Sequence, residues 1–176
     1  MNIDLFEGKM KIVGVEEARR LSGAELAGWN ILSICGRMNE RLSFPGARST
    51  KSLHFDDVEA DCPEVGGFAA RPEDIQEALA FARGIDDEPL LIHCAAGISR
   101  STAIAWVIIY DKLKEEPDAV RRSFDIVRKL RPILMPNRHV LRLGVEALAP
   151  KGSRKRIMQQ FRDCLAELNQ PGTTAG

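Results

Sequence analysis

The sequence lacks the features that mark several large classes of protein. Lysine and arginine together number 25, and so do aspartate and glutamate, so no net charge points to nucleic acid or an anionic membrane as a general partner. No stretch reaches the roughly 18 consecutive apolar residues of a membrane span. The first residues also lack the apolar run of a secretory signal peptide. We therefore expect a cytoplasmic protein without a membrane span.

Cysteine and histidine are scarce as well. The four cysteines are Cys35, Cys62, Cys94 and Cys164. Their spacing fits neither a zinc site nor a dense disulfide framework. His54 and His139 have no partners at metal-ligand spacing, so we expect no metal and no other cofactor. We expect the cysteines to be free thiols in a reducing compartment, where one of them can be reactive.

The composition that remains is that of a folded domain. Apolar residues make up 44% of the 176 residues and charged residues 28%, which suits one globular unit with a packed core. No internal repeat or long linker divides the chain. We expect a single domain over residues 1–170 and a frayed tail over residues 171–176.

Short apolar runs alternate with amphipathic stretches in the first half of the chain. Runs rich in Ile, Leu and Val predict strands, which are residues 11–14, 30–35, 52–56 and 89–93. Between them, residues 15–26 and 71–83 predict helices, the second with its apolar residues at helical spacing. This alternation predicts an α/β fold with a central, mostly parallel sheet of four to five short strands flanked by helices.

The second half of the chain shows only helical patterns. The expected helices are residues 101–113, a helix with Pro117 in its first turn, residues from about 137 to 148, and residues 153–168. Two long irregular segments, 41–51 and 57–70, adjoin predicted strands. Ligands of open parallel sheets gather at the carboxyl ends of the strands, so these segments are candidate parts of a site.

Residues 93–101, His-Cys-Ala-Ala-Gly-Ile-Ser-Arg-Ser, carry the chemistry. A buried strand runs there into a loop of small residues that opens a buried helix. The backbone N–H groups of the loop are expected to bind an anion, helped by the helix N-terminus. The residues of this phosphate-binding loop are Ala95, Ala96, Gly97, Ile98, Ser99 and Arg100. Such surroundings lower a cysteine pKa from about 8.5 to roughly 3.5–7.5, which makes Cys94 a candidate nucleophile toward phosphorus.

Arg100 closes the loop and adds specificity to the pattern. Its planar guanidinium can hold two phosphoryl oxygens, which lysine cannot reproduce. The spacing from Cys35 to Arg41 is the same, but that pair lacks the preceding histidine, the glycine three residues on, and the serine after the arginine. We interpret it as a chance match. The alternative for Cys94 is an inert buried thiol in a structural turn.

The segment 93–101 resembles the signature loop of the cysteine-dependent protein tyrosine phosphatases, His-Cys-x5-Arg-Ser/Thr. Its Ala-Gly-Ile-Ser-Arg-Ser stretch is most similar to the compact dual-specificity branch, and the resemblance extends over residues 30–148. It implies a two-step reaction in which Cys94 forms a phosphocysteine intermediate that water hydrolyses. It also implies that Ser101 assists departure of the thiolate and that His93 orients and tunes the loop. A buried His93 satisfied by nearby backbone is the alternative.

The reaction also needs a general acid, because an alkoxide or phenolate leaves poorly without a proton. The resemblance implies an aspartate on a loop some thirty-odd residues before the nucleophile. Asp57, 37 residues before Cys94, is the favoured candidate, followed by Asp56 and then Asp61. The alternative is that these are ordinary solvated carboxylates.

Residues 131–137 resemble a loop that the family packs against the signature loop. Asn137 would then support that loop through hydrogen bonds, or it would simply cap the helix that follows. Cys62 lies in the segment of the candidate acids. It is a candidate for a protective disulfide with Cys94 under oxidation.

The predicted function is hydrolysis of phosphomonoesters, with phosphotyrosine in proteins as substrate and phosphoserine and phosphothreonine as further candidates. No Trp-Pro-Asp loop and no tyrosine-containing recognition loop are present, which predicts a shallow pocket with broad specificity. A phosphoinositide or another small phosphate ester is an alternative substrate, although the loop offers no lysine to bind extra phosphates. A phosphate-binding module without catalysis is a third possibility.

Overall fold

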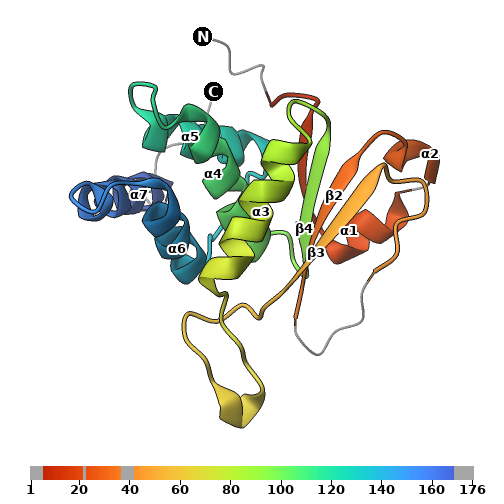
Figure 1. Ribbon diagram of the computed structural model, residues 1–176, viewed down its shortest axis with the longest axis horizontal. Helices are drawn as coiled ribbons and strands as arrows, with labels where there is room; N and C mark the ends of the chain where they lie inside the picture. The colour runs from red at the N-terminus through yellow and green to blue at the C-terminus, as the bar shows by residue number, and fades with distance from the viewer. Residues whose placement is uncertain (1–5, 22, 37–41, 169–176) are drawn as a thin grey trace.

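The computed structural model describes residues 6–21, 23–36 and 42–168. Its sheet consists of β1 (Met10–Gly14), β2 (Asn30–Cys35), β3 (Ser49–His54) and β4 (Leu90–Cys94). All pairs are parallel, and the strand order is β1-β4-β2-β3. The predicted α/β fold with a central parallel sheet is therefore confirmed (Figure 1).

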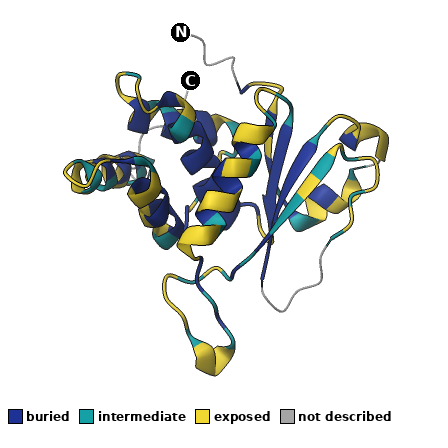
Figure 2. Cartoon of the chain, in the orientation of Figure 1, coloured by how far each residue is buried: buried dark blue, intermediate teal, exposed yellow. Residues whose placement is uncertain are grey.

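The two central strands are buried along their whole length. Every residue of β2 and of β4 is buried, whereas the edge strands β1 and β3 carry exposed or half-buried positions (Figure 2). This pattern follows from layers on both faces of the sheet, which leave no solvated side for a central strand. The apolar runs of the sequence thus reflect position in the sheet.

The layers on the two faces differ in size (Figure 1). One face is covered by α3 (Pro72–Gly84), α4 (Arg100–Leu113), α5 (Ala119–Leu130), α6 (Arg138–Leu148) and α7 (Arg154–Leu168). The other face is covered by the short helices α1 (Val15–Arg20) and α2 (Gly23–Leu26). Helix α4 lies inside the larger layer, where Trp106 stacks on Tyr110 and meets the edge of Phe161. The main core thus surrounds the helix that follows the cysteine.

Three predicted boundaries were wrong. The helix expected over residues 15–26 ends at Arg20, and a separate turn begins at Gly23. The chain becomes extended at Leu21 (φ −72°, ψ 127°), the residue that follows the helix. The third strand begins at Ser49 and ends before the aspartates. Pro117 precedes α5 rather than lying in its first turn.

Asp118 explains that last boundary. It is the residue before α5 and has a left-handed backbone (φ +54°), a conformation that aspartate tolerates better than most side chains. The chain therefore turns at residues 117–118 before the helix starts at Ala119. The remaining helices begin and end close to the predicted residues.

The 57–70 loop projects from the rest of the molecule as a narrow finger (Figure 1, yellow). A pair of backbone hydrogen bonds between Cys62 and Gly67 closes it, and its tip contains a single 3-10 turn, η2 (Pro63–Val65). Its base follows the carboxyl end of β3, at the same edge of the sheet as the end of β4. In the described part of the chain, no helix is both long and apolar enough to cross a bilayer.

Candidate active site

The cysteine loop, Cys94–Arg100, joins the end of β4 to the start of α4. The Cys94 side chain is 2% exposed at the base of this loop. The Gly97 amide donates a hydrogen bond to its sulfur at 3.3 Å, and the Ser101 hydroxyl oxygen lies 3.2 Å from the same atom. Donors directed at the sulfur suit an atom that carries negative charge.

The shape of the cysteine loop depends on two glycines. Gly97 has a left-handed backbone (φ +73°), and a Cβ there would lie 2.5 Å from the backbone nitrogen of Gly14. A Cβ at Gly14 would in turn approach the Ala96 carbonyl oxygen to 3.1 Å. The next amide, that of Val15, donates to the Ala95 carbonyl at 3.0 Å. The junction of β1 and α1 therefore packs directly on the loop, and sequence reasoning had missed the role of Gly14.

Arg100 is buried, with 6% of its surface exposed. Its Nη1 donates to the backbone carbonyl of Phe55 at 2.9 Å, which ties the cysteine loop to the chain just before the candidate acids. Its Nε is also buried and has no hydrogen-bond partner among the described residues. A buried donor without a partner is costly, and an oxygen of a bound oxyanion would satisfy it.

Of the three candidate acids, Asp57 faces the cysteine loop. Its Oδ1 accepts hydrogen bonds from the Ser99 hydroxyl at 2.7 Å and from the Asn137 side-chain amide at 2.9 Å. The next residue, Val58, also accepts from that amide through its carbonyl, at 3.4 Å. The favoured carboxylate is thus held beside the loop that carries Cys94.

The other two aspartates close the base of the 57–70 loop. The Asp56 amide donates to the Phe68 carbonyl at 2.7 Å, and the Asp56 carboxylate accepts from the Phe68 amide at 2.9 Å. Asp61 accepts from the Ala69 amide at 2.8 Å and pairs with Arg71. Both carboxylates hold the base of the loop together, and Asp57 is the candidate acid that bonds to the cysteine loop.

Asn137 caps the helix that follows it, and its side-chain amide bonds to the 57–70 loop. Its Oδ1 accepts from the Val140 amide at 3.0 Å, while its Nδ2 reaches Asp57. Only its backbone amide reaches the cysteine loop, at the Ser99 carbonyl (3.4 Å), so its supporting role stays a prediction. The loop that precedes it packs on the cysteine loop, since the Met135 amide donates to the Ile98 carbonyl at 3.0 Å. The expected contact between the 131–137 loop and the cysteine loop is therefore present.

An ion pair fixes the opposite side of the cysteine loop. Arg131 bonds to Glu17 at 3.0 Å and donates to the Ala96 carbonyl at 3.3 Å. Glu17 in turn accepts from the Gly14 amide at 2.7 Å. Hydrogen bonds from Arg131 and from Gly14 lower the pKa of Glu17 below its ordinary value. Sequence reasoning missed Glu17, because 114 residues separate it from Arg131 and no local pattern marks the pair.

His93 is 1% exposed and lies edge-on to the Phe44 ring, with 5.2 Å between the centroids. Burial lowers its pKa to about 4, and the charge of Arg100 acts in the same direction. The backbone of Cys94 acts in the opposite direction and raises the pKa of His93, but this effect is smaller than that of burial. Neither ring nitrogen has a hydrogen-bond partner among the described residues. The ring is therefore neutral near pH 7, and its tuning role remains a prediction.

All four cysteines are free thiols. The sulfur of Cys62 lies 3.6 Å from the Ala60 carbonyl oxygen within the finger, so the proposed pairing of Cys62 with Cys94 remains a prediction. Arg41, the arginine of the chance match, lies outside the described residues.

Comparison with known proteins supports the fold. No family model and no curated protein matches the sequence. Among solved structures, DUSP15 aligns over 88% of this chain and 91% of its own, with TM-score 0.59 and 18% identity. Human DUSP28 aligns over 90% and 94% (TM-score 0.54, 14% identity). PTPMT1, solved in complex with PI(5)P, aligns over 91% and 97% (TM-score 0.55, 14% identity). The chain therefore has the fold of the dual-specificity branch of the cysteine-dependent phosphatases, as its signature segment implies.

Proposed function

We propose that this protein hydrolyses phosphomonoesters through a phosphocysteine intermediate, with phosphotyrosine in proteins as its substrate. Phosphoserine and phosphothreonine are further candidates. One observation carries the proposal: the Cys94 sulfur, the partnerless Nε of Arg100 and the Asp57 carboxylate converge on one loop. A nucleophile, an oxyanion donor and an acid are the three groups that the reaction requires.

In the first step, the Cys94 thiolate attacks phosphorus and the bond to the leaving oxygen breaks. Asp57 gives its proton to that oxygen, so a neutral alcohol or phenol departs. The two bonds to Asp57 both end on Oδ1, which leaves Oδ2 to carry the proton. The loop amides and Arg100 stabilise the charge that develops on the phosphoryl oxygens.

In the second step, the ionised Asp57 takes a proton from water, which attacks the phosphocysteine. The S–P bond breaks, and inorganic phosphate and the Cys94 thiolate form. The hydroxyl of Ser101, 3.2 Å from the sulfur, donates a hydrogen bond to the departing thiolate. This contact supports the role that the family resemblance implies for Ser101. Asp57 regains its proton as the cycle closes.

The side chains of the cysteine loop favour a protein substrate. We call the proposed phosphate site, over Cys94 and between the amides of the cysteine loop and Arg100, the cup. Ala95, Ala96, Ile98 and Ser99 add no positive charge around it. A phosphoinositide headgroup with several phosphates would need such charge. A small phosphate ester remains the second candidate, because PTPMT1, solved with PI(5)P, shares the fold.

A thiolate nucleophile also bears on where the protein works. Thiolates are the form of cysteine that oxidants attack, and only a reducing compartment keeps them available. This chemistry is our reason for proposing a cytoplasmic enzyme.

Replacing the nucleophile tests the proposal. We expect Cys94→Ser to lower kcat for p-nitrophenyl phosphate by about 10⁴-fold or more, because the serine hydroxyl is not ionised near neutral pH. Binding of inorganic phosphate, measured by calorimetry, should persist because the loop amides remain. Cys62→Ser makes the same chemical change outside the cup and should leave kcat unchanged. Turnover that survives in Cys94→Ser would refute the assignment.

A further inference from the structure

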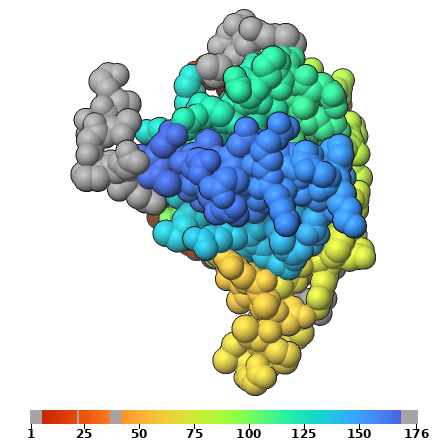
Figure 3. Space-filling model, turned by 90° about the vertical axis from the view of Figure 1, so that its left-hand side faces the viewer, coloured from red at the N-terminus to blue at the C-terminus, as the bar shows by residue number. Residues whose placement is uncertain are grey.

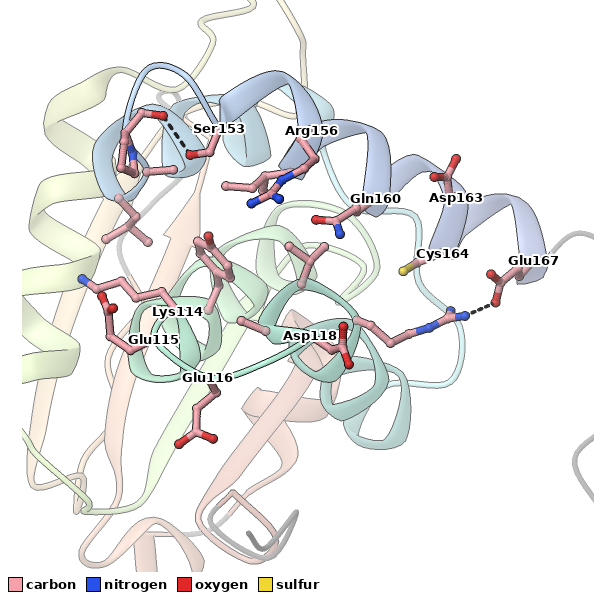
Figure 4. Close-up of a pocket in the computed structure, with 18 residues that line it drawn as sticks. Lys114, Glu115, Glu116, Asp118, Ser153, Arg156, Gln160, Asp163, Cys164 and Glu167 are labelled. Carbon is pink, nitrogen blue, oxygen red and sulfur yellow. Dashed lines mark hydrogen bonds and ion pairs between the residues drawn. The ribbon is translucent and has the colours of Figure 1, made fainter.

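A hollow of about 650 Å³ lies at the amino ends of β2 and β3, at the opposite edge of the sheet from the cysteine loop, and two more of similar size lie against α7. One of these two, of about 580 Å³, is formed by α4, α5 and α7 (Figure 4). Its wall contains charges of both signs, and some of these pair with one another, as Arg121 does with Glu167 at 2.6 Å. The other hollow, of about 620 Å³, lies between α6, α7 and the 131–137 loop, and we call it the groove. Only the groove borders the loops of the candidate active site.

We propose that the groove binds a segment of the substrate protein in which acidic and apolar residues flank the phosphorylated residue. This inference rests on the proposed phosphatase function and specifies its substrates. Three features carry it: the position of the groove beside the cup, its apolar floor and its basic rim.

The groove begins where the cup ends. Met135, one of its lining residues, donates its amide to the Ile98 carbonyl of the cysteine loop. Glu59, on the other side, lies two residues beyond Asp57 in the 57–70 loop. A polypeptide whose phosphate occupies the cup would therefore pass over Met135 into the groove.

The floor of the groove is apolar. Its members are Leu134, Leu141, Met158, Phe161, Leu165 and Leu168. Four of these six are only partly buried, although they pack against the main core. Among the described residues, the large apolar side chains that are most exposed are Val65, Ile133 and Met135, and two of these belong to the 131–137 loop. The partly exposed side chains of the floor offer apolar contacts to a bound segment.

The rim of the groove is basic. Arg138, Arg142 and Arg162 line it, against the single carboxylate of Glu59. Arg142 is paired with Glu146 at 2.7 Å, whereas Arg162 bonds to the neutral amide of Gln159. No ion pair involves Arg138 in the described part of the chain. An acidic segment complements this rim, and complementary charge selects partners and speeds their association.

The form of the surface favours a polypeptide over a bilayer. Figure 3 shows α7 lying across this side of the molecule with the finger projecting below it. Two helices and a loop thus enclose the groove, and an extended chain fits such a channel. A recessed floor lined by two helices and a loop suits an extended chain better than a flat bilayer.

Synthetic phosphotyrosine peptides test the proposal. One set carries alternating Glu and Leu on the amino side, one on the carboxyl side, and a control set carries Lys and Ser. The measured quantity is kcat/KM for each peptide divided by kcat/KM for p-nitrophenyl phosphate, which reports on the cup alone. We expect one acidic set to exceed the control by about tenfold or more.

Variants on α7 locate the effect. Arg162→Glu should lower the ratio for the preferred peptide several-fold, and added salt should reduce the difference. Met158→Gln, on the floor, should lower the ratio at low and high salt alike. Lys155→Glu makes the same charge change on the same helix outside the groove and should leave the ratio unchanged.

Binding to Cys94→Ser, followed by fluorescence anisotropy, tests the groove without turnover. A wild-type protein inactive on p-nitrophenyl phosphate would refute the proposed function, while peptide binding that depends on Arg162 would still support the groove. Equal ratios for all peptides, or a preference unaffected by Arg162→Glu, would overturn the groove as a peptide site. Two further measurements on Arg162→Glu test other occupants of the groove: binding to phosphatidylserine vesicles and dimer formation in sedimentation. If Arg162→Glu abolishes either one while the peptide ratio stays the same, the groove serves a membrane or a second copy of the chain, and the proposal is overturned.

Discussion

The cysteine loop and the 57–70 loop both contribute to the candidate site, but they are held in different ways. The cysteine loop is fixed through its backbone: Gly97 leaves no room for a side chain, and four of the loop carbonyls accept hydrogen bonds from segments far away in the sequence. The 57–70 loop reaches the cysteine loop through one side chain, that of Asp57. Its tip is open, and Val65 is 84% exposed.

This difference matches the two chemical tasks. A nucleophile and the amides around it must be held in place before the substrate arrives, because preorganised donors require no reorganisation during the reaction. An acid must meet leaving groups of different sizes, from a phenol to a small alkoxide. Side-chain bonds from Ser99 and Asn137 position Asp57 without fixing the backbone of the whole finger. Matched changes in the two loops should therefore have different effects on activity and stability.

The largest effect is expected for the acid. Asp57→Asn should lower kcat by about 10²–10⁴-fold for phosphate esters with poor leaving groups, because the amide has no proton to donate. The loss should be much smaller for p-nitrophenyl phosphate, whose leaving group needs little protonation. Steady-state rates across aryl phosphates of graded leaving-group pKa measure the difference.

Asp56→Asn is the matched control, since it makes the same change at the adjacent residue. It should weaken the closure onto Phe68 and reduce stability by about 1 kcal/mol, with a small change in kcat. If Asp56→Asn instead shows the dependence on the leaving group, Asp56 is the acid and our assignment is wrong.

Each loop contains a glycine with a left-handed backbone, Gly97 in the cysteine loop and Gly66 in the 57–70 loop, and replacing each by alanine compares how tightly the two loops are packed. Gly97→Ala should reduce stability by roughly 2–5 kcal/mol, since strain adds to a clash with the end of β1 at Val13 and Gly14. A displaced loop should also lower kcat/KM by about 10²-fold. Gly66→Ala, at φ +70° with nothing within 4 Å of the added Cβ, should cost only about 1 kcal/mol.

Urea unfolding and p-nitrophenyl phosphate turnover of both variants check this pair. Similar losses in the two variants would mean that backbone strain alone governs both sites. The packing of the cysteine loop on the end of β1 would then have no special importance.

The cysteine loop was also the easier of the two to predict from the sequence. Its motif is contiguous, and the buried strand before it is a plain apolar run, so local patterns suffice. The choice between Asp56 and Asp57 depends on which way each side chain points, and one residue reverses that direction at the end of a strand. The family resemblance, rather than periodicity, favoured Asp57.

The supporting residues of the site could not be predicted in this way. Gly14 ends β1 and Glu17 lies in the helix that follows, and they meet the cysteine loop only because β1 and β4 pair in the sheet. Arg131 lies 114 residues from Glu17. A single sequence records periodicity and motifs, but it does not record which distant segments come together.

The third prediction concerns the histidine behind the cysteine loop. Burial lowers the pKa of His93 to about 4 in the folded state, below the ordinary value of 6.5. Between pH 6.5 and 4 the unfolded chain therefore binds the proton that the folded chain excludes. Stability should fall as the pH decreases through this range, by at most about 1.4 kcal/mol per pH unit from this group.

Urea unfolding of the wild type and of His93→Gln over this pH range isolates the contribution. The difference in stability between the two proteins should change with pH between 6.5 and 4 and level off outside that range. Parallel curves would show that His93 titrates alike in the folded and unfolded states. Burial of His93 behind the cysteine loop would then not reduce the stability of the protein at low pH.

The smallest effect is expected for the ion pair beside the cysteine loop. Glu17→Gln should reduce stability by about 0.5–1 kcal/mol, because Glu17 and Arg131 are partly exposed and water screens their attraction. The pKa of Glu17 is lowered in the folded state, so this contribution is present above its unfolded pKa and is lost as the pH falls through the folded value. We expect kcat/KM to fall by a few-fold at low salt, since Arg131 also holds the Ala96 carbonyl, and the fall to shrink at high salt.

Glu16→Gln is the matched control, because Glu16 pairs with Arg19 on the exposed side of the same helix at 2.8 Å. It should change stability by a similar amount and leave kcat/KM unaltered. Equal effects of both variants on kcat/KM would mean that α1 acts on the site only through its general stability. An effect confined to Glu17→Gln would show that an ion pair at the surface helps to hold the backbone of the cysteine loop, which the 57–70 loop achieves only through the side chain of Asp57.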